Sequence, residues 1–459
     1  MSELFAARTQ MALSLGFHIV FAAVGMALPL MMLAAERQWL RRGDPDALEL
    51  AKTWAKVTAV LFAIGAVSGT ALSFELGLLW PTFMEFAGPL FGLAFTTEGF
   101  AFFIEAIFLG LYLYGWDRLS PRAHWLCGIP VAVSGAASGI LVLSANSWMQ
   151  TPAGFDLTPE GRVVNVDPLR AFFNPAYGLM ALHSTLSVYQ AVGFAAAGVY
   201  AYALLKGRRP ARAAYDRRAL GIAMALGGVT ALLQPISGDL LAKQTARHQP
   251  AKLAAMEAQF ETARGAPLRI GGWPDEAAGR TDYAIEIPGL LSFLATGDFD
   301  GEVKGLADIP RDEWPPVRVT HVAFQVMVGC GVLMAALAVW FGVAWWRDRR
   351  AGRDLARRRR LLRALVLAAP LGFVAIEAGW TVTEVGRQPW IVYGVMRTAE
   401  GVTPATGVPL TLTLFTLLYL GLALALVVLL RRLSRGEGGR GHTAGGRASA
   451  HAGGSRAGV

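Results

Sequence analysis

The chain has 459 residues, of which 54% are hydrophobic and only 16% are charged, and its mean hydropathy is +0.43. Soluble domains carry about 25% charged residues, so this composition excludes a soluble enzyme and indicates that lipid surrounds most of the chain. The net charge of +9 would favour nucleic acid as a partner of a soluble protein. Because the arginines lie in loops between apolar segments, they set membrane topology instead, and we exclude nucleic acid as a partner.

Nine apolar runs are long enough to cross a hydrocarbon core of about 30 Å. The sequence therefore predicts an all-α integral membrane protein, a bundle of about nine transmembrane helices. No basic segment and no evident cleavage site accompany the first run, so we expect the first helix to be retained. The runs lie near residues 11–35, 55–77, 91–115, 125–147, 175–205, 217–238, 319–346, 361–384 and 409–431.

The loops between these runs alternate in charge. Segments 36–53, 116–124, 206–218 and 347–363 are basic, and the last of them contains nine arginines. By contrast, 78–90 has no Lys or Arg, and 146–174 and 385–408 have two each. Because cytoplasmic loops carry the excess of Lys and Arg, we predict that the N-terminus lies outside and the C-terminus in the cytoplasm.

Four segments follow from this pattern. Residues 1–238 contain helices one to six, and residues 319–431 contain helices seven to nine. Residues 239–318 form one long hydrophilic loop, which the charge pattern places outside; it contains a helical-looking piece from Lys252 to Arg264 and a Gly/Pro-rich remainder. Loops of this length in compact proteins are usually functional or disordered, and we interpret this one as functional. Residues 432–459 are rich in Gly, Ser, Arg and Ala, and we expect a disordered cytoplasmic tail.

Few residues inside the predicted helices can ligate or ionise, and such residues in a bilayer suggest function. Cys127 and Cys330 lie in apolar runs, so neither a disulfide framework nor a cysteine metal site is predicted. His183 follows Pro175 by eight residues and Met327 follows Pro316 by eleven, on two helices that enter from the outside. They therefore lie at similar depths, as a His/Met pair on one haem iron would. The alternative for Met327 is ordinary packing in an apolar helix.

His18 and Glu384 both lie near the predicted outer face. A single His or Glu on a haem iron leaves its sixth position open, where oxygen can bind. The alternative for Glu384 is an interfacial ion pair with Arg387.

Glu98 and Glu105 are seven residues apart and share one face of the third helix. Stacked carboxylates in a membrane are typical of a proton relay. Glu377, seven residues before Glu384, repeats the spacing. Serines 134, 138 and 144 on the fourth helix could hydrate this path, or simply allow close helix packing.

Several stretches together resemble subunit I of cytochrome bd-type quinol oxidases. The run Gly379–Trp390, GWTVTEVGRQPW, is the most specific of them. The resemblance spans residues 1–431 and leaves out the tail. It is carried further by Gly16-Phe17-His18, Glu98-Gly99-Phe100 to Glu105, Gly115-Trp116-Asp117-Arg118, Asn146-Ser147-Trp148-Met149-Gln150, Leu182-His183-Ser184, Lys252-Leu253-Ala254-Ala255-Met256-Glu257 and Phe324-Gln325-Val326-Met327.

This resemblance implies a set of cofactors and roles. His183 and Met327 are expected to ligate a low-spin haem b. His18 and Glu384 are expected to ligate two high-spin haems, one haem b and one haem d, with a b-type haem as the alternative to haem d and with the assignment between the two sites left open. Glu98 is expected beside the oxygen-reducing haem, as a possible further iron ligand, and Glu105 in the proton path. Within the run, Trp380 is expected at the cofactors and Arg387 among the catalytic residues, and Lys252 and Glu257 match residues tied to quinol oxidation.

The resemblance further implies a multi-pass protein of the bacterial inner membrane. Its expected activity is a quinol:oxygen oxidoreductase that takes cytoplasmic protons to form water and so generates proton motive force without pumping. The expected partners are the second oxidase subunit, a small single-helix subunit, quinol, molecular oxygen and the lipid bilayer.

The chain departs from many of these relatives at two points. Gln325 stands where they have arginine, which removes a positive charge that would favour reduced haem; we therefore expect a lower haem potential, or compensation elsewhere. The chain also lacks a long insertion before its seventh helix, which makes it similar to the short-loop group and to cyanide-insensitive oxidases.

The sequence raises three alternatives, of which the first is excluded. A haem-copper oxidase needs a cluster of intramembrane histidines, and two are too few. A secondary transporter could use Glu98, Glu105, Glu377 and Glu384 as proton or ion sites. A scaffold subunit would leave the haems to another chain.

Overall fold

The computed structural model describes residues 2–207 and 210–434. In these residues nine helical spans are long and apolar enough to cross a membrane, so the predicted all-α membrane fold and its number of spans are confirmed. The spans are α1 (Glu3–Arg42), α2 (Pro45–Leu79), α3 (Pro81–Tyr114), α4 (Pro121–Gln150), α6 (Tyr177–Lys206), α7 (Ala213–His248), α10 (Val317–Arg350), the consecutive α11 (Arg359–Ala368) and α12 (Leu371–Val385), and α14 (Val408–Ser434).

Local sequence signals set several helix ends. Helix α1 ends at Gly43, whose φ of 65° is a left-handed conformation that glycine adopts without strain. Asp44 then accepts a hydrogen bond from a backbone N–H at the start of α2, and Pro45 occupies the first helical position. Ser120 and Pro121 repeat this arrangement at the start of α4. The chain therefore turns sharply between long helices.

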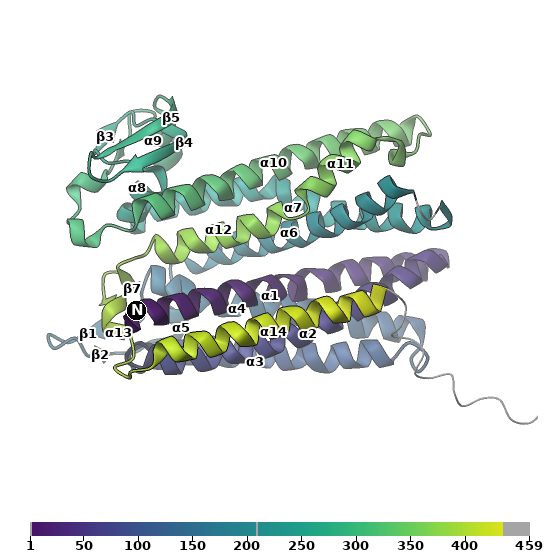
Figure 1. Ribbon diagram of the computed structural model, residues 1–459, viewed down its shortest axis with the longest axis horizontal. Helices are drawn as coiled ribbons and strands as arrows, with labels where there is room; N and C mark the ends of the chain where they lie inside the picture. Colours follow the sequence, from purple (N-terminus) through teal and green to yellow (C-terminus); the bar gives the residue numbers. More distant parts are fainter. Residues whose placement is uncertain (1, 208–209, 435–459) are drawn as a thin grey trace, which may run out of the picture.

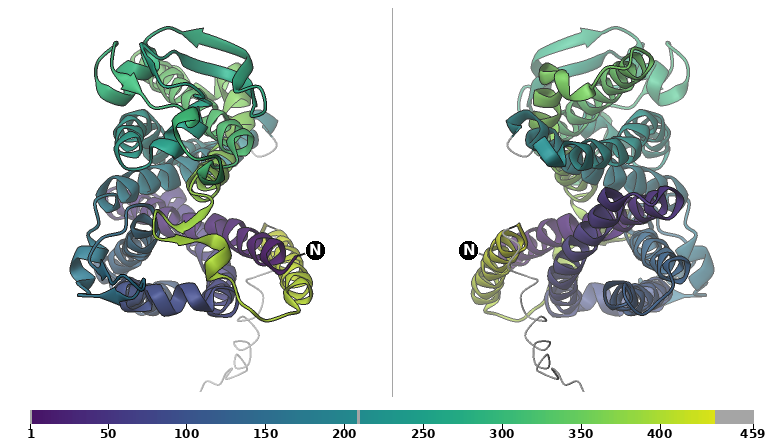
Figure 2. Two further views of the ribbon diagram at one scale, coloured as in Figure 1. Left: turned by 90° about the vertical axis from the view of Figure 1, so that its left-hand side faces the viewer. Right: turned by 90° about the vertical axis from the view of Figure 1, so that its right-hand side faces the viewer.

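The long helices form two groups (Figure 2). Helices α1 to α4 pack with α14, while α6, α7 and α10 pack with α11 and α12. Helices α1 and α4 contact α6, which joins the groups. One hydrophobic cluster runs through both, because it contains Tyr112 of α3, Phe194 of α6 and Met334 of α10.

The short elements gather at one end of the bundle, where the N-terminus also lies (Figure 1). The sequence predicted that the N-terminus and the hydrophilic segment lie on the same side of the membrane, which requires this arrangement. That this end faces outward stays a prediction. The short helices are α5 (Pro168–Phe172), α8 (Pro250–Glu257), α9 (Leu290–Thr296) and α13 (Thr398–Gly401). The antiparallel strand pairs are β1 (Asp156–Leu157) with β2 (Val163–Val164), β3 (Ala263–Arg264) with β6 (Glu302–Val303), β4 (Leu268–Asp275) with β5 (Arg280–Ile287), and β7 (Trp390–Val392) with β8 (Met396–Arg397).

The hydrophilic segment differs in detail from its prediction. Helix α7 continues to His248 instead of ending at residue 238. The expected helix from Lys252 to Arg264 is wrong beyond Glu257, because Ala258 adopts a left-handed conformation with a φ of 49° and the chain continues into β3. Helices usually end on glycine in this conformation, so alanine there carries no sequence signal.

The C-terminal boundary lies close to its prediction. Helix α14 continues to Ser434, so the first residues of the expected tail are helical. The rest of that tail, residues 435–459, lies outside the described residues.

Candidate functional site

His183 lies on α6 against the end of α7. Its Nδ1 is 3.0 Å from the hydroxyl of Ser237, and the amide nitrogen of Gln234 lies 3.3 Å from Nδ1 and 3.2 Å from Nε2. A Cβ added to Gly238 would come within 3.4 Å of the ring. The imidazole is therefore held from one side by three residues of α7.

Met327 lies on α10 at the same level as His183. Two turns along each helix, Gln190 of α6 lies 3.6 Å from the sulfur of Met334 of α10, and both helices run in the same direction. Seven residues correspond to about 10 Å of helix rise and return to nearly the same face. His183 and Met327 therefore occupy corresponding positions on the same pair of helices. Their joint ligation of one haem iron stays a prediction.

The Met327 sulfur also has a close neighbour on α12. A Cβ added to Gly379 would lie 3.0 Å from Sδ. Trp380, the next residue, is partly buried against the hydrophobic cluster that runs through both helix groups. Gly379 and Trp380, the first two residues of the GWTVTEVGRQPW run, therefore lie beside Met327 and the shared core, respectively.

His18 repeats the surroundings of His183 in the other helix group. Its Nδ1 lies 3.0 Å from the hydroxyl of Ser68 on α2. A Cβ on Gly69 would lie only 2.8 Å from Cε1 of the ring. Helix α2 therefore holds the His18 ring as α7 holds the His183 ring.

Both carboxylate oxygens of Glu384, at the end of α12, are bonded to neighbouring side chains. One carboxylate oxygen accepts a hydrogen bond of 2.5 Å from the side-chain amide of Asn146 on α4, and the other accepts one of 2.5 Å from Arg387. Arg387 is 3% exposed, donates also to the carbonyl of Trp390, and has one guanidinium nitrogen that is buried without a partner. The ion pair considered from the sequence is present, with Arg387 buried and the side chain of Glu384 28% exposed, and Arg387 can also orient and balance an anionic group.

The other carboxylates singled out from the sequence lie between α1, α3, α4 and α12. Ser138 of α4 lies 3.5 Å from a carboxylate oxygen of Glu98, at the limit of a hydrogen bond. Glu105 is 5% exposed, and one of its oxygens is buried without a partner between Gly25 and Gly135. Because the two neighbouring residues are glycines without side chains, their backbone lies close to the carboxylate of Glu105.

Glu377 reaches from α12 to α1, where a Cβ on Gly16 would lie 3.1 Å from its carboxylate. Its other oxygen is buried without a partner. Glu377 and Glu384, seven residues apart, both point from α12 toward the first helix group, since their neighbours lie on α1 and α4. The interface between the two groups is therefore lined with polar side chains.

Lys252 points from α8 into the same interface. Its ammonium group donates a hydrogen bond of 2.6 Å to Gln150 at the end of α4, and its side chain lies against Gly386. Burial lowers the pKa of Lys252 to about 7, helped by the positive charge of Arg387 and opposed by Glu384. Lys252 is thus a buried amine that can exchange a proton near neutral pH.

Glu257 is also buried, but on another side of α8. It is 5% exposed, and one of its oxygens has no partner. Burial raises the pKa of Glu257 to about 8, against the opposing influence of Arg269. Five residues turn a helix by about 140°, so Lys252 and Glu257 do not face each other. The structure therefore does not bring these two predicted residues together.

His321 and Gln325 attach the hydrophilic segment to α10. Both ring nitrogens of His321 lie near backbone carbonyls, those of Met256 at 2.8 Å and Gly271 at 3.0 Å. The side-chain amide of Gln325 donates to the carbonyl of Arg269 and accepts from the N–H of Gly271, each at 3.0 Å. The residue that departs from the family pattern is thus used to hold β4.

Two buried acidic sites were not singled out from the sequence. Glu36 accepts a hydrogen bond of 2.6 Å from Tyr112 and lies 2.7 Å from Nδ1 of His124. Tyr112 follows Glu98 and Glu105 at the same seven-residue spacing, a signal that could have found it. Glu75 on α2 is fully buried and accepts a hydrogen bond of 3.1 Å from Gln10. It was missed because its contacts come from other helices.

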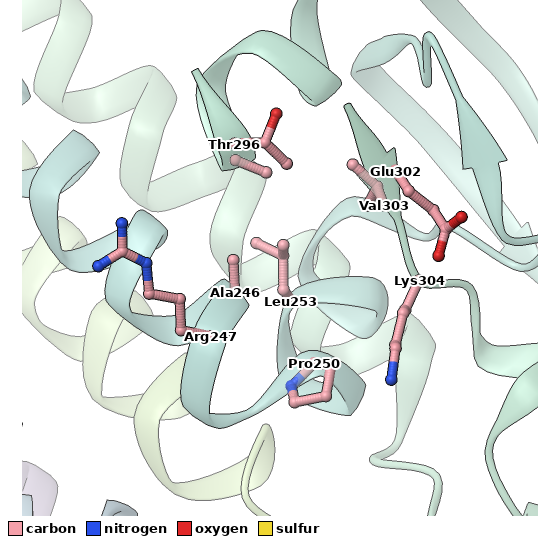
Figure 3. Close-up of a pocket in the computed structure, with 9 residues that line it drawn as sticks. Ala246, Arg247, Pro250, Leu253, Thr296, Glu302, Val303 and Lys304 are labelled. Carbon is pink, nitrogen blue, oxygen red and sulfur yellow. The ribbon is translucent and has the colours of Figure 1, made fainter. Parts of the chain in front are cut away.

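Two further features lie apart from these residues. A pocket of about 420 Å³ opens where α7 meets α8, α9 and β6 (Figure 3). It is lined by Ala246, Arg247, Pro250, Leu253, Ala295, Thr296, Glu302, Val303 and Lys304, and Lys252 and Glu257 do not line it. Within the described part of the chain, no group of three or more His, Cys, Asp or Glu residues converges on a metal position.

The donor set fits haem iron, which needs only one or two protein ligands. In both His18 and His183, Nδ1 lies within hydrogen-bond distance of a serine hydroxyl, and that serine does not bond to Nε2. Glycine lies against His18, His183 and Met327 on the neighbouring helices. Buried atoms without partners occur on Arg387, Asn146 and Glu377, as expected where a polar group is to be received.

Known proteins resemble this chain over nearly its whole length. The family model of cytochrome bd terminal oxidase subunit I matches residues 6–437. A protein of Bacillus subtilis (strain 168) that carries the name of a cytochrome bd menaquinol oxidase subunit I is 39% identical, over 94% of this chain and 96% of its own length. Cytochrome bd-II ubiquinol oxidase subunit 1 of Escherichia coli (strain K12) is 27% identical, over 93% and 95%.

A solved structure agrees with these similarities. The bd oxidase from Geobacillus thermodenitrificans superposes with a TM-score of 0.87 at 40% identity, covering 94% of this chain and 98% of the other. Its family implies haem cofactors and a second subunit as partner. The fold and these similarities show that the chain belongs to the cytochrome bd terminal oxidase subunit I family and is a multi-pass bacterial membrane protein of a quinol oxidase.

Proposed function

We propose that this chain is the haem-bearing subunit of an electrogenic quinol:oxygen oxidoreductase, which oxidises quinol at the end of the bundle carrying α8 and reduces oxygen to water. The observation that supports this most strongly is the pairing of His183 and Met327 at one level of α6 and α10, fixed by the contact between Gln190 and Met334 two turns away. A histidine and a methionine on opposite sides of an iron are the ligands of electron-transferring haems.

In this proposal, His183 and Met327 hold a low-spin haem b. His18 and Glu384 hold the two high-spin haems, one haem b and one haem d or b-type, with Glu98 as a further ligand and Trp380 packing beside the cofactors. When bound, the haems carry electrons from quinol and supply the iron at which oxygen is reduced. Arg387 balances the charge of Glu384 and offers its unpartnered nitrogen to an anionic cofactor group.

Lys252 accepts a proton that quinol loses, and Glu257 takes one after it has released its own. A buried amine with a pKa near 7 is in part neutral at neutral pH and can take a proton. Glu257, whose pKa burial raises to about 8, stays mainly protonated until the pH exceeds that value. Since the two side chains lie on different sides of α8, they serve separate proton transfers rather than one shared pair.

Protons for water enter from the cytoplasm and pass Glu105 toward Glu98. This direction follows from an outward N-terminus and a cytoplasmic C-terminus, which the loop charges favour. Quinol protons leave on the other side, so charge is separated across the membrane without a pump. The second oxidase subunit, quinol, oxygen and the bilayer are the partners of this scheme, with a small single-helix subunit as a further one.

A reduced-minus-oxidised spectrum tests the proposal, combined with haem extraction from the purified two-subunit complex. We expect a Soret band, a low-spin haem b signal and high-spin signals, and we expect His183→Ala to lose the low-spin signal alone. Met334, two turns deeper on the same face of α10, provides the matched control Met334→Leu for Met327→Leu. The absence of any Soret band, or a low-spin signal that survives His183→Ala, would contradict the proposal.

A further inference from the structure

The two histidines face the same dipeptide on two different helices. His18 of α1 lies against Ser68-Gly69 of α2, and His183 of α6 lies against Ser237-Gly238 of α7. In both cases the serine hydroxyl is 3.0 Å from Nδ1. The two sites belong to the two separate helix groups, so each group contains its own copy of the arrangement.

The serine hydrogens define the direction of both bonds. Ser68 donates its hydroxyl hydrogen to the carbonyl of Gly65 at 3.1 Å, and Ser237 donates to the carbonyl of Gln234 at 2.9 Å. A hydroxyl has one hydrogen but can accept two bonds. Since that hydrogen is already used, each serine accepts from Nδ1–H of its histidine. Nδ1 therefore carries the proton, and the lone pair of Nε2 is the one left for a metal.

The glycine is needed for the close approach of the ring at the His18 site. A Cβ at Gly69 would lie 2.8 Å from Cε1 of His18, a distance that real side chains do not tolerate. One at Gly238 would lie 3.4 Å from Cε1 of His183, which is ordinary van der Waals contact. Serine thus fixes the proton at both sites, while the following glycine makes room for the ring at His18 and lies against the ring at His183.

Gln234 distinguishes the two copies. It occupies the position three residues before Ser237 that Gly65 occupies before Ser68. Its amide nitrogen is almost equally far from the two ring nitrogens of His183, at 3.3 and 3.2 Å. Equal distances place it over the face of the ring, because a position in the ring plane would clash with Cε1. It therefore does not occupy the in-plane lone pair of Nε2.

We propose that Ser68-Gly69 and Ser237-Gly238 are positioning elements that fix the tautomer and orientation of the two iron-ligating histidines. This inference rests on the proposed function, in which His18 and His183 are those ligands. A hydrogen bond from Nδ1–H makes the other nitrogen a stronger donor to the metal. Stronger donation stabilises the oxidised iron, so each serine lowers the midpoint potential of its own haem.

Redox titration of the two-subunit holoenzyme, followed in the optical spectrum and by resonance Raman, tests the inference. We expect Ser237→Ala to raise the midpoint potential of the low-spin haem and to leave the high-spin haems unchanged. Ser68→Ala should do the reverse, changing only the haem held by His18. Ser→Thr at either position keeps the hydroxyl and should restore the wild-type potential.

Two control variants remove hydroxyls on the same helices without facing a histidine. Ser73 of α2 donates to the carbonyl of Gly69, and Thr230 of α7 donates to the carbonyl of Leu226. Ser73→Ala and Thr230→Val should shift no haem potential. Should Ser237→Ala fail to assemble, Ser237→Cys retains a weaker acceptor and should give a smaller upward shift.

The outcomes separate this inference from the proposed function. If His183→Ala removes the low-spin haem but Ser237→Ala and Ser237→Cys leave its potential unchanged, the serines do not position the ligand and the inference is wrong. If the low-spin haem survives His183→Ala, the ligand assignment itself fails.

Discussion

Several functional side chains owe their chemistry to burial at the interface between the two helix groups. Lys252 shows this most directly, because the residue is 6% exposed, its amine donates to Gln150, and the guanidinium of Arg387 and the carboxylate of Glu384 act on it. The same residue on a solvated helix would be fully charged at neutral pH. Its environment, rather than its residue type, makes it a plausible proton acceptor.

The buried amine predicts a pH-dependent stability. The pKa of Lys252 is about 7 in the folded chain and about 10.4 in a model peptide, so between these values the unfolded state binds one proton more than the native state. The free energy of unfolding therefore rises with pH between these two values. Below about pH 7, the full penalty of deprotonating or burying the charged Lys252 amine applies. Lys252→Met removes the penalty, so its apparent Tm should exceed that of the wild type by more at about pH 6 than at about pH 9.

The control for this prediction is a lysine outside the interface. Lys304→Met lies at the rim of the surface pocket of Figure 3, where the lysine is exposed, and it should leave the pH dependence of the Tm unchanged. Parallel Tm curves for Lys252→Met and wild type across this pH range would contradict the prediction.

A second prediction concerns the charge at position 325. It lies two positions before Met327 and replaces the arginine of many relatives, so Gln325→Arg should raise the low-spin haem potential by adding a positive charge. The substitution also breaks the two hydrogen bonds to β4. Gln325→Met breaks them without adding charge, and the difference between the two variants in a redox titration measures the charge alone. No upward shift of Gln325→Arg relative to Gln325→Met would disprove it.

At the scale of elements, buried polar pairs join the helices at the end of the bundle away from the short strands. Glu36 of α1, Tyr112 of α3 and His124 of α4 are bonded together, and all three are at most 1% exposed. His124 also places Nε2 within 2.8 Å of the carbonyl of Tyr112. Three helices are thus tied by one network, which is costly to leave incomplete.

Removing one member of this network should destabilise the bundle. Tyr112→Phe leaves a carboxylate oxygen of Glu36 without its donor, and a hydrogen bond to a charged group contributes about 1.5–3 kcal/mol. We expect a lower Tm with an unchanged haem spectrum. Tyr114, two residues further along the same helix, is 77% exposed, so Tyr114→Phe is the matched control and should leave the Tm unchanged. Equal Tm values for both variants would argue against the network.

At the scale of the whole molecule, six of the nine spans in the described residues lie between the N-terminus and the hydrophilic segment, so both are at the same end (Figure 1). The loops that contain most of the arginines lie at the opposite end. An outward position for the hydrophilic segment puts Lys252 and Glu257 on the side where quinol protons are released. Glu105 and Glu377 then lie deeper in the membrane than Glu98 and Glu384, respectively.

Cysteine labelling tests this orientation. In a chain with Cys127 and Cys330 replaced by alanine, Tyr283→Cys and Arg353→Cys introduce exposed thiols at the two opposite ends, since Tyr283 is 93% exposed. A membrane-impermeant maleimide added to intact cells should label position 283 and leave position 353 unlabelled until the cells are lysed. The reverse pattern would invert the orientation and the proposed direction of proton uptake.

The sequence alone determined the membrane class, the nine spans and the family. These depend on long apolar runs and on a specific motif, and both are local properties of the chain. His183 and Met327 could also be paired, because helix rise converts sequence position into depth. The helix expected to reach Arg264 was wrong because Ala258 ends α8 in a conformation that its residue type does not announce.

Only the tertiary structure decided which side chains meet across helices. Ser68 and Ser237 meet their histidines, Asn146 meets Glu384, and Gln150 meets Lys252, in each case from a helix far away in sequence. From the sequence, Glu36 and Glu75 could not be distinguished from carboxylates at the membrane surface, because their bonding partners also lie on other helices. The rotation and spacing of packed helices depend on all their contacts at once, so no single segment of the chain contains that information.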